Sequence, residues 1–207
     1  MAFKNFSKLS TRIQSGLISQ LHQLISYYGE IFCPRDRVYL KDISQTNSAI
    51  YWLETEDKKI SAAAIVDPNY VFKVSDISIV TLGHLVSRRP GQMERILNHI
   101  FEDYSEQSLM LFCRPNIAIG IQPEVYDFVP FSPLQLSTMW SELAQIPTDY
   151  FNISTEKLVE GLDRKDHYIY LRLSSQDYYT LAKIKPEIIK YIDSYLESVA
   201  DEFIEEE

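Results

Sequence analysis

The segment that most constrains the fold lies between residues 75 and 113, where two apolar runs flank a short turn and a helix. The first run, SDISIVTLGHLV (Ser75–Val86), is apolar on both alternating faces, which is typical of a strand covered on both sides. The turn RRPG follows it, and SLMLFC (Ser108–Cys113) predicts a second doubly covered strand. Apolar residues between them share one helical face: Met93, Ile96, Leu97, Ile100 and Phe101. A strand–helix–strand unit of this kind predicts a mixed α/β sheet.

Upstream of this unit the sequence predicts one helix and a few strands. Apolar residues at helical spacing mark the helix, which Ser10 or Thr11 would cap and Tyr28-Gly29 would end: Leu9, Ile13, Leu17, Leu21 and Leu24, with Ile18 and Ile25 widening the stripe. The predicted strands cover residues 37–40, 49–54 and 59–66. We expect the last of them to end at Asp67-Pro68-Asn69, because these are turn residues.

Downstream, the pattern alternates between helix and strand. Residues 116–128 are expected to be partly helical, and residues 129–140 are ambiguous. Thr148–Leu162 contains a helix with Ser154 or Thr155 as its cap, His167–Leu173 is a strand, and Ser174–Glu207 is helical. We therefore expect an α/β (α+β) fold with a mixed, mostly antiparallel sheet. Residues 1–175 would form this domain, and residues 176–207 would form an acidic amphipathic helix packed on it or extending from it.

Composition excludes several classes of function. The formal net charge of -9 opposes non-specific binding of nucleic acid, which needs a basic surface. The two cysteines are far apart and the four histidines are scattered, so no metal site is expected. No apolar run approaches the roughly 20 residues of a membrane span, and the N-terminus lacks a signal-peptide pattern. The sequence predicts a cytoplasmic protein.

The order of elements, together with the turn RRPGQM, resembles the GNAT superfamily of acyl-CoA-dependent N-acyltransferases over roughly Ala49–Phe128. In that family a turn Q/R-x-x-G-x-G/A follows the central strand, and its backbone amides hold the pyrophosphate of coenzyme A at a helix N-terminus. Arg88 takes the first place of the motif and Gly91 the fourth. The resemblance implies a cofactor site at Leu85, Val86, Arg88, Arg89, Gly91, Gln92, Met93 and Asn116.

Two residues of the turn depart from the family pattern. Pro90 occupies the third place and has no N–H to donate. Met93 occupies the sixth place, where Gly or Ala would let a phosphate approach the backbone. Each charge-assisted hydrogen bond lost in this way is worth roughly 1.5–3 kcal/mol. We therefore expect a degenerate turn that binds no cofactor, with acetyl-CoA as the ligand if the turn is functional.

The resemblance also implies catalytic residues, should the chain be active. Tyr126 matches the tyrosine that protonates the leaving thiolate, although Asp127 stands where Gly is usual. A general base would come from Glu54 or Glu56 on a hairpin beside the central strand. His84 lies on that strand among apolar residues and is interpreted as a core histidine.

The C-terminal helix is the main feature outside the resemblance. From Lys190 to Glu207 there are seven acidic residues and one Lys. An apolar stripe runs along one face of the same predicted helix: Ile188, Ile192, Leu196, Val199 and Phe203. The stripe would pack on the domain itself or bind a protein partner, with the acidic rim attracting a basic one.

These observations lead to three hypotheses. The first is a catalytically degenerate GNAT-fold protein that acts as an interaction subunit or adaptor. Small acidic adaptors and chaperones, including those that serve bacterial secretion, share this general composition. The second is an active acyl-CoA-dependent N-acetyltransferase on a small amine or a protein amine. The third is an α+β domain unrelated to the family.

Overall fold

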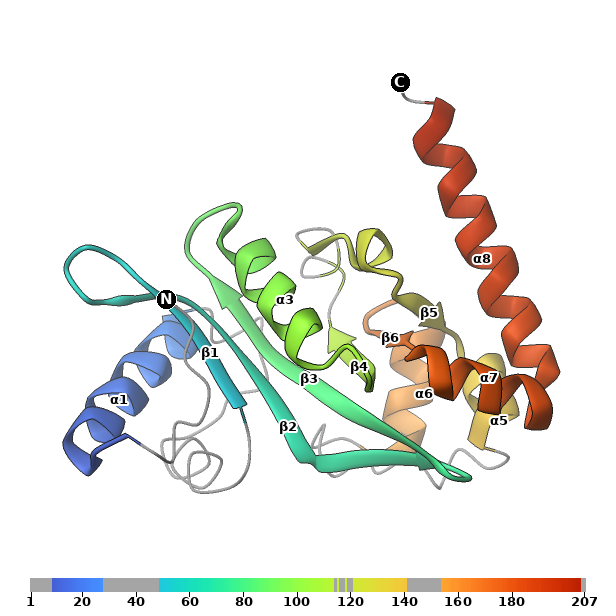
Figure 1. Cartoon of the computed structure of the whole chain (residues 1–207), viewed down its shortest axis with the longest axis horizontal. Helices are drawn as coiled ribbons and strands as arrows, with labels where there is room; N and C mark the ends of the chain where they lie inside the picture. The colour runs from blue at the N-terminus through green and yellow to red at the C-terminus, as the bar shows by residue number, and fades with distance from the viewer. Residues whose placement is uncertain are drawn as a thin grey trace. The chain divides into compact units, whose positions relative to one another are not determined.

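The computed structural model describes residues 9–27, 49–113, 115, 118, 121–140 and 154–205 (Figure 1). It is an α+β fold with a mixed, mostly antiparallel sheet, as predicted. The first elements are α1 (Thr11–Tyr27), β1 (Ala49–Glu54), β2 (Ile60–Val74), β3 (Ile77–Ser87), α3 (Gln92–Asp103) and β4 (Ser108–Cys113). The next are the 3-10 helix η2 (Pro123–Tyr126), β5 (Val129–Phe131), α5 (Pro133–Trp140) and α6 (Thr155–Asp163). The last are β6 (Tyr168–Arg172), α7 (Ser175–Ile184) and α8 (Pro186–Glu205).

The strands are hydrogen-bonded in the order β1-β2-β3-β4-β6-β5. The described residues form two compact units. The first lies within Met1–Val71 and Val80–Ser105, and the second within Phe72–Ile79 and Glu106–Glu207. The long hairpin of β2 and β3 therefore contributes to both units.

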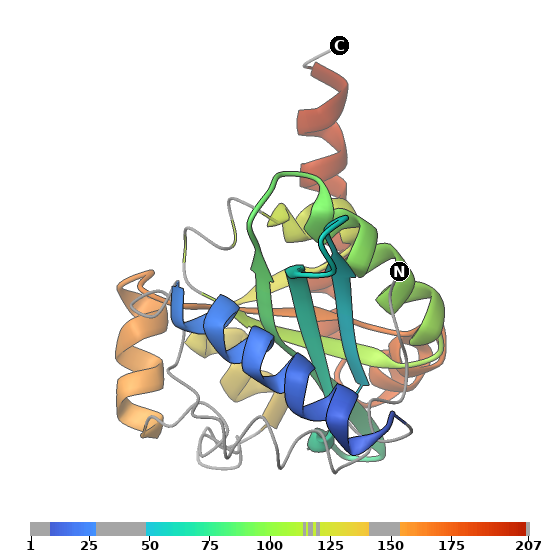
Figure 2. The same ribbon diagram turned by 90° about the vertical axis from the view of Figure 1, so that its left-hand side faces the viewer.

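In the first unit, alternation along β1 sends side chains to two helices. Ile50 and Trp52 belong to a buried cluster with Leu21 and Leu24 of α1, which crosses the strands in Figure 2. Tyr51, on the opposite face, is only 1% exposed and donates its hydroxyl hydrogen to the Asp103 carboxylate at the end of α3, over 2.8 Å. Helices thus cover both faces of these strands, which explains why their sequences are apolar on both sides.

Two predictions for this unit need correction. Ile13 of the predicted stripe is 52% exposed, because the buried face of α1 begins only at Leu17. Strand β2 does not end at Asp67-Pro68-Asn69 but continues to Val74. The pairing of β1 with β2 finishes at Ala49 and Val66. Pro68 therefore lies past the end of β1, where its missing N–H leaves no hydrogen bond to β1 unmade.

In the second unit, β6 lies between β4 and β5 and pairs antiparallel with both. Ser154 and Ser174 cap α6 and α7, each accepting a hydrogen bond from the amide of its third following residue. The predicted helical segment at 174–207 divides at Lys185-Pro186, because Pro suits a first helical turn and not a helix interior. The predicted strand at 37–40 and the predicted helix end at Tyr28-Gly29 lie outside the described residues.

Candidate functional site

The first two backbone amides of the turn between β3 and α3 donate hydrogen bonds within the protein. The Arg88 amide donates to the carbonyl oxygen of Ser61 on β2, over 2.9 Å. The Arg89 amide donates to the Ser87 hydroxyl over 3.3 Å, and this hydroxyl in turn donates to the Arg89 carbonyl over 2.7 Å. Pro90 has no amide hydrogen. The first three positions of the motif therefore direct no free backbone donor toward a ligand.

A series of side-chain hydrogen bonds also connects this turn to the strands. Gln92, the first residue of α3, donates from Nε2 to the Ser61 hydroxyl over 2.8 Å. Ser61 is 2% exposed and donates to the carbonyl of Leu53 on β1, over 3.2 Å. The start of α3 is thus connected by hydrogen bonds through β2 to β1. The sequence analysis missed Ser61 and Ser87, although a serine directly before a turn is a known signal for local hydrogen bonding.

The start of α3 keeps some capacity for an anion. Gly91, the N-cap, has φ +74°, a conformation that explains why glycine stands there, and it supplies no side-chain cap. The first amides of α3 lack intrahelical partners, as in any helix, and exposed Arg88 and Arg89 lie directly before them. Glu94 in the first turn adds a negative charge at this end. Half-buried Met93 fills the position where the family motif has a small side chain.

The other sequence-predicted site residues lie on several elements. Leu85 and Val86 of β3 are 4% and 2% exposed, so their side chains belong to the core. Glu54 is exposed at the end of β1 and accepts a hydrogen bond from Trp52 Nε1, and Glu56 is exposed in the following hairpin turn. These residues and the turn belong to the first unit.

The proposed acid, Tyr126, belongs to the second unit. It ends η2 and is half-buried, and the next residue, Asp127, has a left-handed conformation with φ 61°. Asp127 thus keeps the backbone shape that Gly would favour at this place, because Asp tolerates it better than most residues. Asn116 lies outside the described residues, and of His84 only the backbone, in β3, is described.

Beside Tyr126, polar groups gather around Glu124. The Tyr195 hydroxyl on α8 donates to Glu124 Oε1 over 3.3 Å. Burial, and then the nearby Glu124 carboxylate, raise the pKa of Tyr170 above its ordinary value. The same two causes raise the pKa of the Cys113 thiol to about 12. Both groups are therefore protonated at neutral pH, so the buried, free thiol of Cys113 is a poor nucleophile.

The apolar stripe of α8 divides into two parts. Ile188 and Ile192 are 1% and 5% exposed, so at these two positions the stripe is part of the core, which is one of the two alternatives that the sequence left open. Leu196 and Val199 are half-buried and line a cavity of about 350 Å³. The side chain of Phe203 lies outside the described part. In Figure 1 the last turns of α8 extend beyond the other elements of the second unit.

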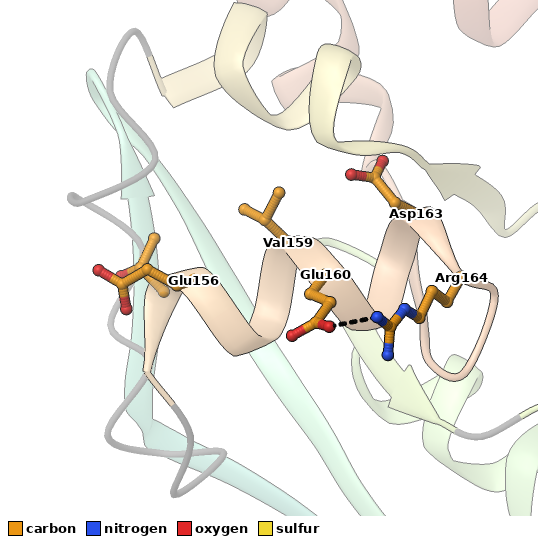
Figure 3. Close-up of a pocket in the computed structure, with 6 residues that line it drawn as sticks. Glu156, Val159, Glu160, Asp163 and Arg164 are labelled. Carbon is orange, nitrogen blue, oxygen red and sulfur yellow. Dashed lines mark ion pairs between the residues drawn. The ribbon is translucent and has the colours of Figure 1, made fainter.

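A larger cavity, of about 590 Å³, lies along α6 (Figure 3). The described residues that line it include three acids, Glu156, Glu160 and Asp163, and one base, Arg164, which forms an ion pair with Glu160 at 2.7 Å. Both partners of this pair are exposed, so it contributes little to stability. None of the sequence-predicted site residues lines this cavity.

Two other kinds of site are absent from the described residues. Within the part of the chain that the structure describes, no group of three or more His, Cys, Asp or Glu residues could hold a metal ion. None of the described helices is long and apolar enough to cross a membrane.

Comparison with solved structures identifies the fold. The structure is similar to an acetyltransferase of the GNAT family from Staphylococcus aureus Mu50, with a TM-score of 0.51 at 10% identity over 84% of this chain and 99% of that one. It is also similar to Rv2747 from Mycobacterium tuberculosis in complex with CoA and NLQ, with a TM-score of 0.50 at 11% identity over 77% and 95% of the two chains. No family model and no curated protein sequence matches. The chain therefore has a GNAT fold, and at these identities the likeness extends to the fold alone.

Proposed function

We propose that this chain is a GNAT-fold protein that has lost acyl transfer and acts as a protein-interaction subunit. The observation that carries the proposal is the state of the turn before α3. The amides of Arg88 and Arg89 already donate within the protein, and Pro90 has none to donate. A pyrophosphate at this turn would have to break those hydrogen bonds or bind without them.

Acceptors within the protein compete with a phosphate ligand for the amides of this turn. A charge-assisted hydrogen bond to phosphate is worth roughly 1.5–3 kcal/mol, so the loss of several removes much of the affinity for coenzyme A. The arginine side chains would supply attraction at long range, but exposed charges are screened by salt and by water.

The competing function is acyl transfer from acetyl-CoA to an amine, with Tyr126 as the acid. A thiol-release assay separates the two, in which acetyl-CoA is mixed with a panel of polyamines, amino acids and lysine peptides. We expect the wild-type chain to release thiol no faster than buffer does. Release that is fast with wild-type protein and lost in a folded Tyr126→Phe variant would establish the acyltransferase and reject the proposal.

A further inference from the structure

The second unit contains an apolar groove, and none of the described residues fills it. Two elements form it: η2 contributes Glu124 and Val125, with Asp127 directly after it, and α8 contributes Leu196, Val199 and Ala200. Val125 is 54% exposed, and Ala200 is also exposed. The hydrogen bond from Tyr195 to Glu124 connects the two elements at the side of this groove. We call these six residues the η2–α8 groove.

The spacing of its apolar residues suits a helical ligand. Leu196 and Val199 are three positions apart and share one face of α8, which is the spacing along which helices pack against each other. An amphipathic helix that lies along α8 would place its own apolar residues between these side chains and Val125. Helix-in-groove recognition of this kind uses anchors at i, i+3 or i+4, and i+7.

Charge selects the class of ligand. Glu124 and Asp127 line the groove itself, and exposed Glu197 and Asp201 lie on the same part of α8. The last turn of α8 has no basic residue, so no side chain of that turn offsets the negative end of the helix dipole. A second copy of this chain would bring the same acidic surface against itself, at a cost in like-charge repulsion.

We infer that the η2–α8 groove binds a basic amphipathic helix of a partner protein. This inference rests on the proposed function and names the surface and the partner chemistry that it requires. Lys or Arg side chains of the partner would lie near the carboxylates, and its apolar stripe would cover Val125, Leu196 and Val199.

The test uses a defined peptide on the full chain. The probe is a fluorescein-labelled helix of Leu and Lys, about five turns long, with all leucines on one face. Two controls have Glu in place of Lys, or the same composition in a permuted order without an apolar face. Fluorescence anisotropy should give a micromolar Kd for the probe and values at least about tenfold weaker for both controls. Equal binding of the permuted peptide would overturn the inference, because it would show attraction by charge alone.

Matched variants locate the site. Val125→Lys places a cation in the groove, whereas Leu134→Lys places one on α5, where the native side chain is 70% exposed. Both positions are exposed, so both variants should fold, and circular dichroism checks this. We expect Val125→Lys to weaken the probe at least about tenfold and Leu134→Lys to leave its Kd unchanged. Equal effects would overturn the assignment. A second comparison, Asp127→Asn against Asp163→Asn on α6, repeats the test with carboxylates.

Two further outcomes are informative. Sedimentation velocity tests whether the chain self-associates. If it does, and if Val125→Lys abolishes the association but Leu134→Lys does not, the groove binds a second copy of this chain, and the inference of a basic partner is overturned. Failure of the groove is also distinct from failure of the proposed function. Amine turnover with intact probe binding would reject the loss of catalysis and keep the groove, whereas no turnover and no probe binding would reject the groove only.

Discussion

The turn before α3 carries two exposed arginines at the N-terminus of that helix, which is the positive end of its dipole. The η2–α8 groove, in contrast, carries carboxylates near the C-terminal end of α8, which is the negative end of the dipole of α8. The amides of Arg88 and Arg89 in this turn donate inside the protein, to Ser61 and Ser87. In the groove, exposed apolar side chains lie beside the acids. The difference teaches that the presence of suitable charges does not define a site. What matters is whether the neighbouring donors and apolar atoms are already satisfied within the chain.

The largest expected effect tests the division of the α8 stripe. Ile188→Ala should lower the free energy of unfolding by about 2–5 kcal/mol, because it leaves a cavity in a buried site. Val199→Ala, at a half-buried position of the same helix, should cost less than about 1 kcal/mol. Urea denaturation of both variants measures the difference. Equal costs would show that the whole of α8 packs on its own unit and that the groove is an ordinary part of the core.

A second prediction concerns a double variant that brings the turn before α3 closer to the family motif. Pro90→Ala adds an amide donor and Met93→Gly removes the side chain at the sixth place of the motif. The double variant should bind coenzyme A at least about tenfold more tightly than wild type in a calorimetric titration. Asn98→Gly, at an exposed position of the same helix, controls for the cost of glycine in a helix, roughly 1 kcal/mol. An unchanged affinity in the double variant would mean that these two residues are not what limits the cofactor.

The smallest effect concerns Asp127. Replacement by Gly should raise the free energy of unfolding by about 0.5 kcal/mol, because its left-handed φ of 61° suits Gly better. The same variant should weaken the Leu/Lys probe, because it removes a groove carboxylate. Asp127→Asn retains the tolerance for this backbone conformation and separates the two effects. A gain in stability without a loss of probe binding would remove Asp127 from the groove.

Local patterns predicted much of the fold. The strand at Ser108–Cys113 has the predicted bounds, because a run that is apolar on both faces and bounded by polar residues has one simple interpretation. The cap of α6 was predicted to be Ser154 or Thr155, and the structure shows that it is Ser154. The end of β2 was not, because the tolerance for Pro68 depends on where β1 stops, which the residues around Pro68 do not encode.

The candidate sites were less accessible to sequence reasoning. The motif at residues 88–93 and its two departures are visible in the sequence. The hydrogen bond from Gln92 to Ser61, however, joins residues 31 positions apart, and no local pattern indicates it. The groove similarly joins η2 to the end of α8, and only the structure shows that the apolar stripe is buried at Ile192 and half-exposed at Leu196. The roles proposed for Tyr126, Glu54 and Glu56 stay predictions.

The most direct test of the account is a calorimetric titration of the purified chain with acetyl-CoA and with free coenzyme A. The amides of Arg88 and Arg89 donate within the protein, and Pro90 has no amide hydrogen. The account therefore predicts no measurable heat of binding up to millimolar ligand, which corresponds to a binding free energy weaker than about 4 kcal/mol. Micromolar binding that Arg88→Ala weakens would contradict it, because the turn would then hold pyrophosphate despite its internal hydrogen bonds.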